Sequence, residues 1–258
     1  MHDRLIPFDR IYNFRDFGGY DTPSGPLARG VLFRSASFHD ATEADIAKLE
    51  AMDVRFLVDL RRPEERAFEP NRWPGENRRS IFNDEGAGGV NLPPHLVALL
   101  QSDLSPASVT HYMKSLYREI PFDPRLVTLY RAWFDEMSEG GVGVIHCAAG
   151  KDRTGIGCAL TLLALGVSED DVFADYEFTN QAVDIEARLP RIQERMEERL
   201  ARKLDAASLR PMLGVDGDYL REAFDAIEDR CGGVDGYLAD VLGLDEDSRA
   251  SLRKRLIG

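Results

Sequence analysis

The stretch VGVIHCAAGKDRTGIGCALTLLAL, residues 142–165, carries the features that decide the fold class. Residues 142–147 are mostly apolar and predict a buried strand that runs straight into a loop containing Gly150. Residues 154–165 then predict an apolar helix. A buried strand that passes through a short loop into a helix is typical of α/β proteins with a parallel sheet.

The same alternation of strands and helices extends over the first two thirds of the 258-residue chain. We expect strands at 31–36, 54–60 and 78–83. We expect helices at 42–52, where Thr42 is a suitable cap, at 61–66 with Pro63 in its first turn, and at 95–103, 106–119 and 123–138. Residues 1–29 and 85–94 should be irregular. The pattern predicts an α/β fold with a central, mostly parallel sheet flanked by helices.

The C-terminal third should be helical, with helices near 168–180, 184–206, 216–230, 233–242 and 246–256. The segment from Ile185 carries one apolar stripe on an otherwise charged helix, formed by Leu189, Ile192, Met196, Leu200 and Leu204. We expect Pro190 to break or kink that helix near Leu189.

Composition is that of an ordinary globular protein, with 43% hydrophobic residues and a net charge of -13. Such an acidic chain is a poor general ligand for nucleic acid and is repelled, on average, by an anionic membrane surface. Any anionic substrate must therefore be attracted by a local positive field.

Three widely spaced cysteines, Cys147, Cys158 and Cys231, do not suggest a disulfide framework. Neither a signal peptide nor an 18-residue apolar run is apparent, so we expect a cytoplasmic protein without stable membrane insertion. Cys158 should pack in the core and Cys231 should be inert. The sequence does not indicate an oligomeric state.

The loop at 147–153 has the chemistry of an oxyanion cradle. Its backbone N–H groups and the N-terminus of the following helix should surround a tetrahedral anion. The phosphate-binding residues would be Ala148, Ala149, Gly150, Lys151, Asp152, Arg153 and Thr154. The helix N-terminus favours the thiolate form of Cys147, which could attack phosphorus, while Arg153 could hold the equatorial oxygens. Thr154 could donate its hydroxyl to the thiolate, and His146 should brace the loop.

This segment resembles the active-site signature of the protein-tyrosine-phosphatase superfamily, His-Cys-five residues-Arg-Thr/Ser. Five further patches resemble a bacterial branch that includes tyrosine and phosphoinositide phosphatases: 13–19 (NFRDFGG), 34–35 (RS), 59–61 (DLR) with Glu64, 151–152 (KD) and 232–238 (GGVDGYL). The resemblance implies the superfamily's α/β fold over residues 1–258 as one phosphatase domain. It also implies that residues 183–215 form a helical lid over the active site, and it gathers Arg15, Arg34, Arg61 and Arg62 near the loop.

A general acid is harder to find. The well-known tyrosine phosphatases use an aspartate in a Trp-Pro-Asp loop, but Trp73, Pro74 and Gly75 lack the acid here. Two candidates remain. Asp59 ends a predicted parallel strand and is slightly favoured, and Asp152 lies within the loop. Asp59 could instead pair with Arg61 or Arg34, and Asp152 could position Arg153 or Lys151. Asp16 is a distant third candidate.

These residues predict hydrolysis of phosphomonoesters on tyrosine, with serine, threonine or a phosphoinositide as further substrates. The alternatives are a phosphatase of inositol phosphates or nucleotides, a non-catalytic phosphotyrosine-binding module, and a sulfurtransferase that holds cysteine in a similar loop. No His/Cys/Asp cluster has metal-ligand spacing, and the proposed chemistry requires neither metal nor cofactor. A further hypothesis assigns Lys151 to the second phosphate of a multiply phosphorylated substrate.

Overall fold

A five-stranded sheet forms the centre of the protein, with strand order β1-β4-β7-β5-β6. The strands are β1 (Arg15–Asp16), β4 (Leu32–Ser35), β5 (Val54–Asp59), β6 (Arg79–Ile81) and β7 (Val142–His146). The four strands from β4 to β6 are parallel, whereas β1 is antiparallel at the edge. The structure is a computed structural model that describes residues 2–73, 78–85, 97, 101–200 and 202–258.

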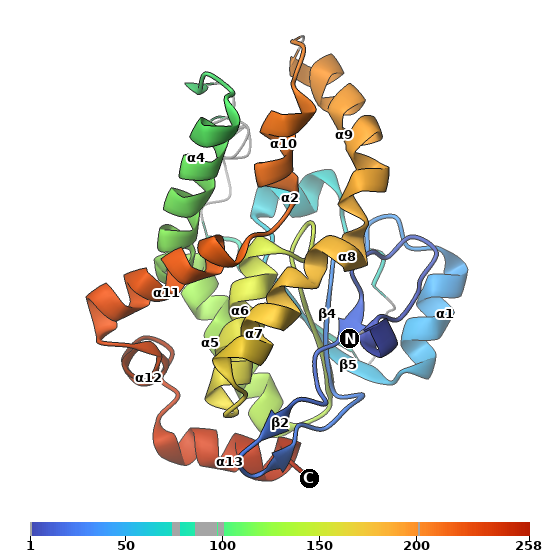
Figure 1. Ribbon diagram of the computed structural model, residues 1–258. Coiled ribbons are helices and arrows are strands. Elements are labelled where there is room, and N and C mark those ends of the chain that lie inside the picture. Colours follow the sequence, from blue (N-terminus) through green and yellow to red (C-terminus); the bar gives the residue numbers. More distant parts are fainter. Residues whose placement is uncertain (1, 74–77, 86–96, 98–100, 201) are drawn as a thin grey trace.

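Side chains alternate between the two faces of the sheet, and each face packs into its own hydrophobic cluster. Phe33, Leu57 and Val144 pack on one face with the N-terminal segment and α1 (Glu43–Ala51). Phe56 and Ile145 pack on the other face, where α5 (Pro124–Glu139) and α6 (Asp152–Ala164) lie. Figure 1 shows the sheet between these layers. The predicted α/β fold with a mostly parallel, helix-flanked sheet is therefore confirmed.

Most predicted elements occur close to their expected bounds. Thr42 caps α1 in a reciprocal capping box with Asp45. Pro63 begins α2 (Pro63–Phe68), and α4 covers Pro106–Glu119. The C-terminal third holds α7 (Glu169–Glu177), α8 (Thr179–Val183), α9 (Ile185–Leu200), α10 (Ala206–Leu213), α11 (Gly217–Cys231), α12 (Val234–Gly236), a π-helical turn (Tyr237–Val241) and α13 (Glu246–Leu256). Two short strands, β2 (Asp21–Thr22) and β3 (Gly25–Pro26), lie in the N-terminal part of the chain. Short 3-10 helices cover His2–Arg4 and Ile120–Phe122.

Several local expectations were wrong. Of the break or kink expected at Pro190, the break does not occur: α9 continues through Pro190 from Ile185, and Leu189 is buried in the core. The helix expected over 184–206 is shorter, and α10 follows as a separate helix that the apolar pattern did not separate. Residues 1–29 contain short strands. The predicted helix at 95–103 and loop at 85–94 fall mostly outside the described residues.

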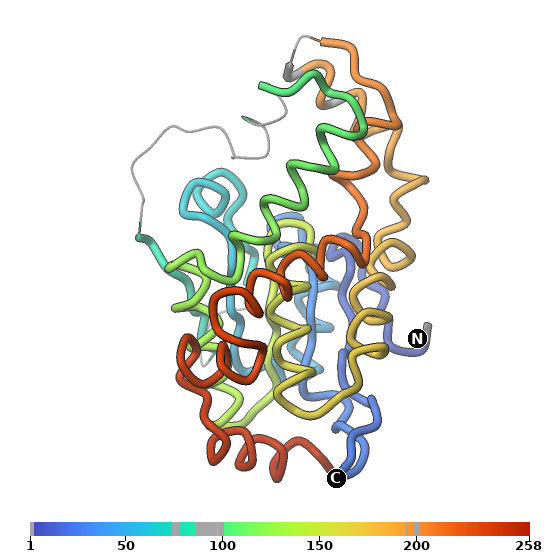
Figure 2. The backbone as a smooth tube through the Cα atoms, turned by 60° about the vertical axis from the view of Figure 1, so that its left-hand side comes forward, coloured from blue at the N-terminus to red at the C-terminus, as the bar shows by residue number. Residues whose placement is uncertain are grey.

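Three helices, α4, α9 and α10, project together from one end of the molecule, and the C-terminus lies at the opposite end (Figures 1 and 2). Contacts between α10 and both α4 and α9 hold the group together. These helices become walls of the cavity described below. Among the described residues, no helix combines the length and apolar character that a membrane span requires.

Candidate active site

The sheet places Cys147 where β7 ends and the loop to α6 begins. Its neighbour His146 is fully buried, stacks on Phe38 with ring centroids 5.2 Å apart, and has Nδ1 2.9 Å from the carbonyl oxygen of Cys147. The His146 carbonyl accepts a hydrogen bond of 2.8 Å from the backbone N–H of Leu60. These contacts fix the entrance to the loop and agree with a bracing role for His146.

Neighbouring groups hold the loop by its carbonyl oxygens. The backbone N–H of Ser37 donates to the Ala148 carbonyl at 3.1 Å. The Asn13 side-chain amide donates to the carbonyls of Ala149 and Gly150, at 3.2 and 2.8 Å. Because the carbonyls are held by the surrounding framework, the N–H groups are left to face the concave side. None of the N–H groups from Ala148 to Arg153 donates a hydrogen bond to another described residue.

Two backbone conformations make this loop possible. Gly150 has φ of 67°, and a Cβ there would lie 2.3 Å from the Ser35 carbonyl oxygen, so a side chain is excluded. Asn13 adopts a left-handed φ of 57°, which is uncommon outside glycine, while its amide clamps the loop. Strain held at such a position is characteristic of functional sites.

Beneath the loop, two fully buried arginines share one carboxylate. Arg34 donates to Asp175 at 2.6 Å and to the Gly150 carbonyl at 3.0 Å, while Arg15 contacts Asp175 at 3.5 Å. Burial would raise the pKa of Asp175, but the two guanidiniums outweigh it and lower that pKa. The resemblance placed Arg15, Arg34 and Arg61 near the loop, and they do lie there. All three, however, are buried in ion pairs, and none is among the residues that line the cavity above Cys147.

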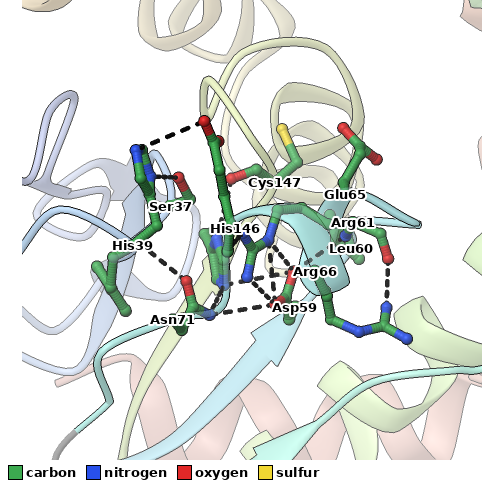
Figure 3. A network of polar contacts seen from close by, with 12 residues as sticks. Ser37, His39, Asp59, Leu60, Arg61, Glu65, Arg66, Asn71, His146 and Cys147 are labelled. Atoms are coloured by element: carbon green, nitrogen blue, oxygen red, sulfur yellow. Dashed lines mark hydrogen bonds and ion pairs between the residues drawn. The ribbon is translucent and has the colours of Figure 1, made fainter. Parts of the chain in front are cut away.

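Asp59 lies in a second buried network, shown in Figure 3. Its carboxylate accepts hydrogen bonds from Arg61 at 2.7–3.2 Å and from the Asn71 amide at 3.1 Å, and it lies 3.5 Å from Nε2 of His146. Although burial opposes it, contact with His146 and Arg61 lowers the pKa of Asp59 far below its usual range. Asp59 is not among the residues that line the cavity. Asp16 also lies elsewhere and accepts backbone N–H groups of Gly18 and Gly30.

Asp152, in contrast, lines the cavity together with Cys147. Its Oδ1 accepts hydrogen bonds from the Tyr117 hydroxyl at 2.7 Å and from Nζ of Lys151 at 2.9 Å. Tyr176, which is buried, donates to the Tyr117 oxygen at 2.6 Å. Lys151 also donates to the backbone carbonyl at residue 214, at 3.1 Å. The side chains around Asp152 therefore fix both its position and that of Lys151.

Arg153 is held from two sides. Its Nη1 and Nη2 make a bidentate ion pair with Glu65 of α2, at 2.6 and 2.9 Å. Tyr130 donates its hydroxyl to the Arg153 carbonyl at 2.7 Å. Burial works against the charge, but Glu65 and then Cys147 and Asp152 raise the pKa of Arg153. The guanidinium is thus oriented before any anion arrives.

A cavity of about 360 Å³ opens above Cys147, within the size range of small-molecule sites. Its floor includes Ala148, Ala149 and Arg153. Its apolar walls come from the three projecting helices, through Tyr112, Met113 and Leu116 of α4, Met196 of α9, and Met212 and Leu213 of α10. A planar aromatic group would find a largely apolar channel that ends at the thiol.

Thr154 and Cys158 are both buried on α6, where their surroundings can be compared with the roles expected from the sequence. The Thr154 hydroxyl is buried and has no hydrogen-bond partner among the described residues, so the expected bond to Cys147 is not formed. Cys158 is fully buried in the main hydrophobic cluster, and burial raises the pKa of its thiol to about 12. That setting agrees with a packing role for Cys158.

Comparison with known proteins identifies the family of the chain. Residues 6–258 match the model of the tyrosine phosphatase family. The chain belongs to this family. A Cupriavidus necator protein named as a candidate tyrosine-protein phosphatase is 32% identical over 95% of this chain and 85% of its own length. The triple specificity protein phosphatase PtpB of Mycobacterium tuberculosis is 31% identical over 96% of this chain and 97% of its own length. A tyrosine-protein phosphatase of Nostoc commune is 24% identical over 88% of this chain and 74% of its own length.

Sequence reasoning missed several residues that hold the site of this phosphatase. Asn13 and Glu65 lie in or beside patches that were noted, but nothing local assigned them to the loop carbonyls or to Arg153. Tyr117 and Asp175 lie on α4 and α7, where the helical pattern indicates only burial. Their partners are 35 and at least 141 residues away along the chain, so no spacing rule could have found them.

Proposed function

We propose that this tyrosine phosphatase hydrolyses aryl phosphomonoesters, phosphotyrosine above all, through a phosphocysteine intermediate. The Cys147 thiolate attacks phosphorus and forms the S–P bond as the P–O bond to the aryl group breaks. The aryl oxygen leaves with a proton from a general acid. Water then attacks the phosphocysteine, which releases inorganic phosphate and regenerates the thiolate.

Arg153 and the loop N–H groups are assigned to the equatorial oxygens of the transferred phosphoryl group. Charge spreads over these oxygens in the transition state, so catalysis depends on preorganised donors around them. Glu65 takes one N–H bond of Nη1 and one of Nη2, and the Leu60 carbonyl takes the other N–H bond of Nη1, which leaves Nε–H and one Nη2 N–H for phosphate. The observation that carries the proposal is this cradle, with Cys147 at its floor and Arg153 at its side.

Asp152 is the better candidate for the general acid. An acid must touch the leaving oxygen and carry a proton when the P–O bond breaks. Asp152 lines the cavity, whereas Asp59 lies below the loop and its pKa is lowered by His146 and Arg61. We therefore assign Asp59 to holding Arg61 and His146, which reverses the slight preference drawn from the sequence.

Residues 183–215 are proposed to act as a lid. Met196, Met212 and Leu213 from this segment already line the cavity above the thiol, so a small outward movement would open it to a peptide. We extend the proposal to phosphoserine, phosphothreonine and phosphoinositides, whose hydrocarbon parts could contact the same apolar wall. One relative is named for triple specificity, which is consistent with such breadth.

The test is turnover of phosphotyrosine peptide by the parent protein and by Cys147→Ser. The parent should release phosphate, and the variant should lose activity by several orders of magnitude while it still binds phosphate. Vanadate should compete with substrate. Binding without turnover in the parent would favour a phosphotyrosine-binding module, and activity of the variant above about one per cent would remove Cys147 from the mechanism.

A further inference from the structure

Three arginines line the cavity, and the charges of two of them, Arg62 and Arg153, act on the third, Arg125. Cys147 lines the same cavity. Nη1 of Arg153 and Nη1 of Arg125 donate to the same atom, the carbonyl oxygen of Leu60, at 3.3 and 3.0 Å. The two nitrogens are therefore at most about 6 Å apart. A cationic position thus lies directly beside the arginine that faces the reacting phosphate.

Arg125 has an unused arm. It is 7% exposed and its Nη1 donates to the carbonyls of Leu60 and Arg61, but its Nη2 is buried and has no hydrogen-bond partner within the described part of the chain. A buried donor without a partner costs about 1–3 kcal/mol, so such groups call for an explanation. Burial, and then the guanidiniums of Arg153 and Arg62, lower the pKa of Arg125, while Asp123 opposes them. An anion at this position would relieve both the missing bond and the repulsion.

Arg62 supplies a second cation from the N-terminal end of α2. It forms no ion pair with any of the described residues. Lys151 is differently placed, because its ammonium is already bound to Asp152 and to the carbonyl at residue 214. The hypothesis that Lys151 recognises a second phosphate is therefore less well supported than a role for the pair Arg62 and Arg125.

We propose that Arg62 and Arg125 form a subsite for a second phosphate on the same ring as the phosphate being hydrolysed. The inference rests on the proposed function, since Arg153 fixes where the first phosphate lies. A phosphate on the neighbouring ring carbon reaches a cation next to Arg153. A carboxylate beside phosphotyrosine does not, because it emerges at the mouth, a whole tyrosine side chain away. The ligand class is a ring with two adjacent phosphates, carried by a free polyol or by a lipid headgroup.

The experiment compares phenyl phosphate with benzene 1,2-bisphosphate and benzene 1,4-bisphosphate. The parent should show a kcat/KM for the 1,2-compound about tenfold above that for phenyl phosphate, as expected for one or two charge-assisted hydrogen bonds. The 1,4-compound should show little gain, because its second phosphate points toward the mouth. Arg62→Gln and Arg125→Lys should each reduce the 1,2-to-mono ratio severalfold. Arg125→Lys keeps a donor for the two carbonyls but removes the planar fork.

Arg10→Gln is the matched control. It changes the net charge as Arg62→Gln does, but Arg10 lies outside the cavity in an exposed ion pair with Asp40. Its ratio should equal that of the parent. Equal kcat/KM for all three compounds, or an equal fall in Arg10→Gln and Arg62→Gln, would overturn the subsite and leave phosphatase activity intact.

Binding separates this inference from the proposed function. In Cys147→Ser, calorimetry should give tighter binding of benzene 1,2-bisphosphate than of phenyl phosphate, whether or not the parent turns either over. Equal affinities would refute the subsite. An inositol with two adjacent phosphates and the same headgroup on a short-chain lipid then distinguish the carriers. A similar gain in affinity from the second phosphate on both carriers supports recognition of the ring. A gain on the lipid alone would assign that gain to contacts with the apolar walls and overturn the proposal.

Discussion

Replacing each of the two candidate acids by asparagine should produce two different defects. Asp59→Asn leaves Arg61 buried without its carboxylate partner. The side chain of Asp59 is 3% exposed and that of Arg61 is 2% exposed. Removing one partner of a buried ion pair costs about 3–5 kcal/mol, and the remaining amide acceptor favours the lower figure. In a chain of this size, about 3 kcal/mol corresponds to a fall of roughly 10 °C in Tm. The parent and the variant should be compared by thermal unfolding.

The same substitution should reduce turnover uniformly. Leu60 and Arg61 supply the carbonyls that orient Arg125, and Leu60 also contacts Arg153, so loosening this segment displaces the phosphate cradle for every substrate. Asp152→Asn should instead act on proton transfer. Its effect should approach 10²–10⁴ for leaving groups as poor as the tyrosine phenolate and should shrink as the leaving group improves.

The assay is kcat for a series of aryl phosphates whose phenols span several pKa values downward from about 10. The plot of log kcat against leaving-group pKa should become steeper for Asp152→Asn and should shift without a change of slope for Asp59→Asn. A steeper slope in Asp59→Asn with an unchanged Tm would refute the assignment. Unchanged slopes in both variants would place the acid elsewhere.

Three further outcomes are expected. The unfolding free energy should fall as pH drops below about 4, because Asp175, whose pKa is lowered in the folded protein, stabilises the fold only while it is ionised. Denaturant titrations of Asp175→Asn should show a weaker dependence on acid than those of the parent. Tyr117→Phe removes the hydroxyl bound to Asp152 and should cut kcat for phosphotyrosine roughly tenfold with KM little changed, whereas Tyr176→Phe should do less. Cys158, whose thiol pKa is about 12, should resist iodoacetamide in the native protein while the nucleophile is alkylated, as read by mass spectrometry.

Sequence patterns predicted the strand, loop and helix that carry the site because these elements are determined by residues close together in the chain. The strand that ends at His146, the glycine at 150 and the helix that follows are written in consecutive residues, and the capping box of Thr42 and Asp45 spans four. The two-residue strand β1 is too short to leave an alternating pattern, and it exists because it pairs with β4. Tertiary pairing of this kind cannot be read from a window of sequence.

The general acid illustrates a different limit. Both aspartates end or begin elements near the loop, so position alone could not separate them. Burial decides: Asp59 meets Arg61 and Asn71 below the loop, while Asp152 meets Tyr117 at the cavity wall. Each of these partners except Arg61 lies at least 12 residues away along the chain. The sequence could offer the two candidates, and only their surroundings could rank them.

The surroundings also explain how a chain with net charge -13 can attract an anion. Arg61 pairs with buried Asp59, whereas Arg15 and Arg34 share the single carboxylate of Asp175, so these three arginines fix the loop from below and are only partly compensated. The groups that line the cavity act on the anion at shorter range: the loop N–H groups, Arg62, Arg125, and Arg153 with its partner Glu65. Acidic residues elsewhere on the surface are screened beyond about 10 Å at ordinary salt, whereas these contacts act at bonding distance. Association should therefore be sensitive to charge at the cavity and nearly insensitive to charge on the remaining surface.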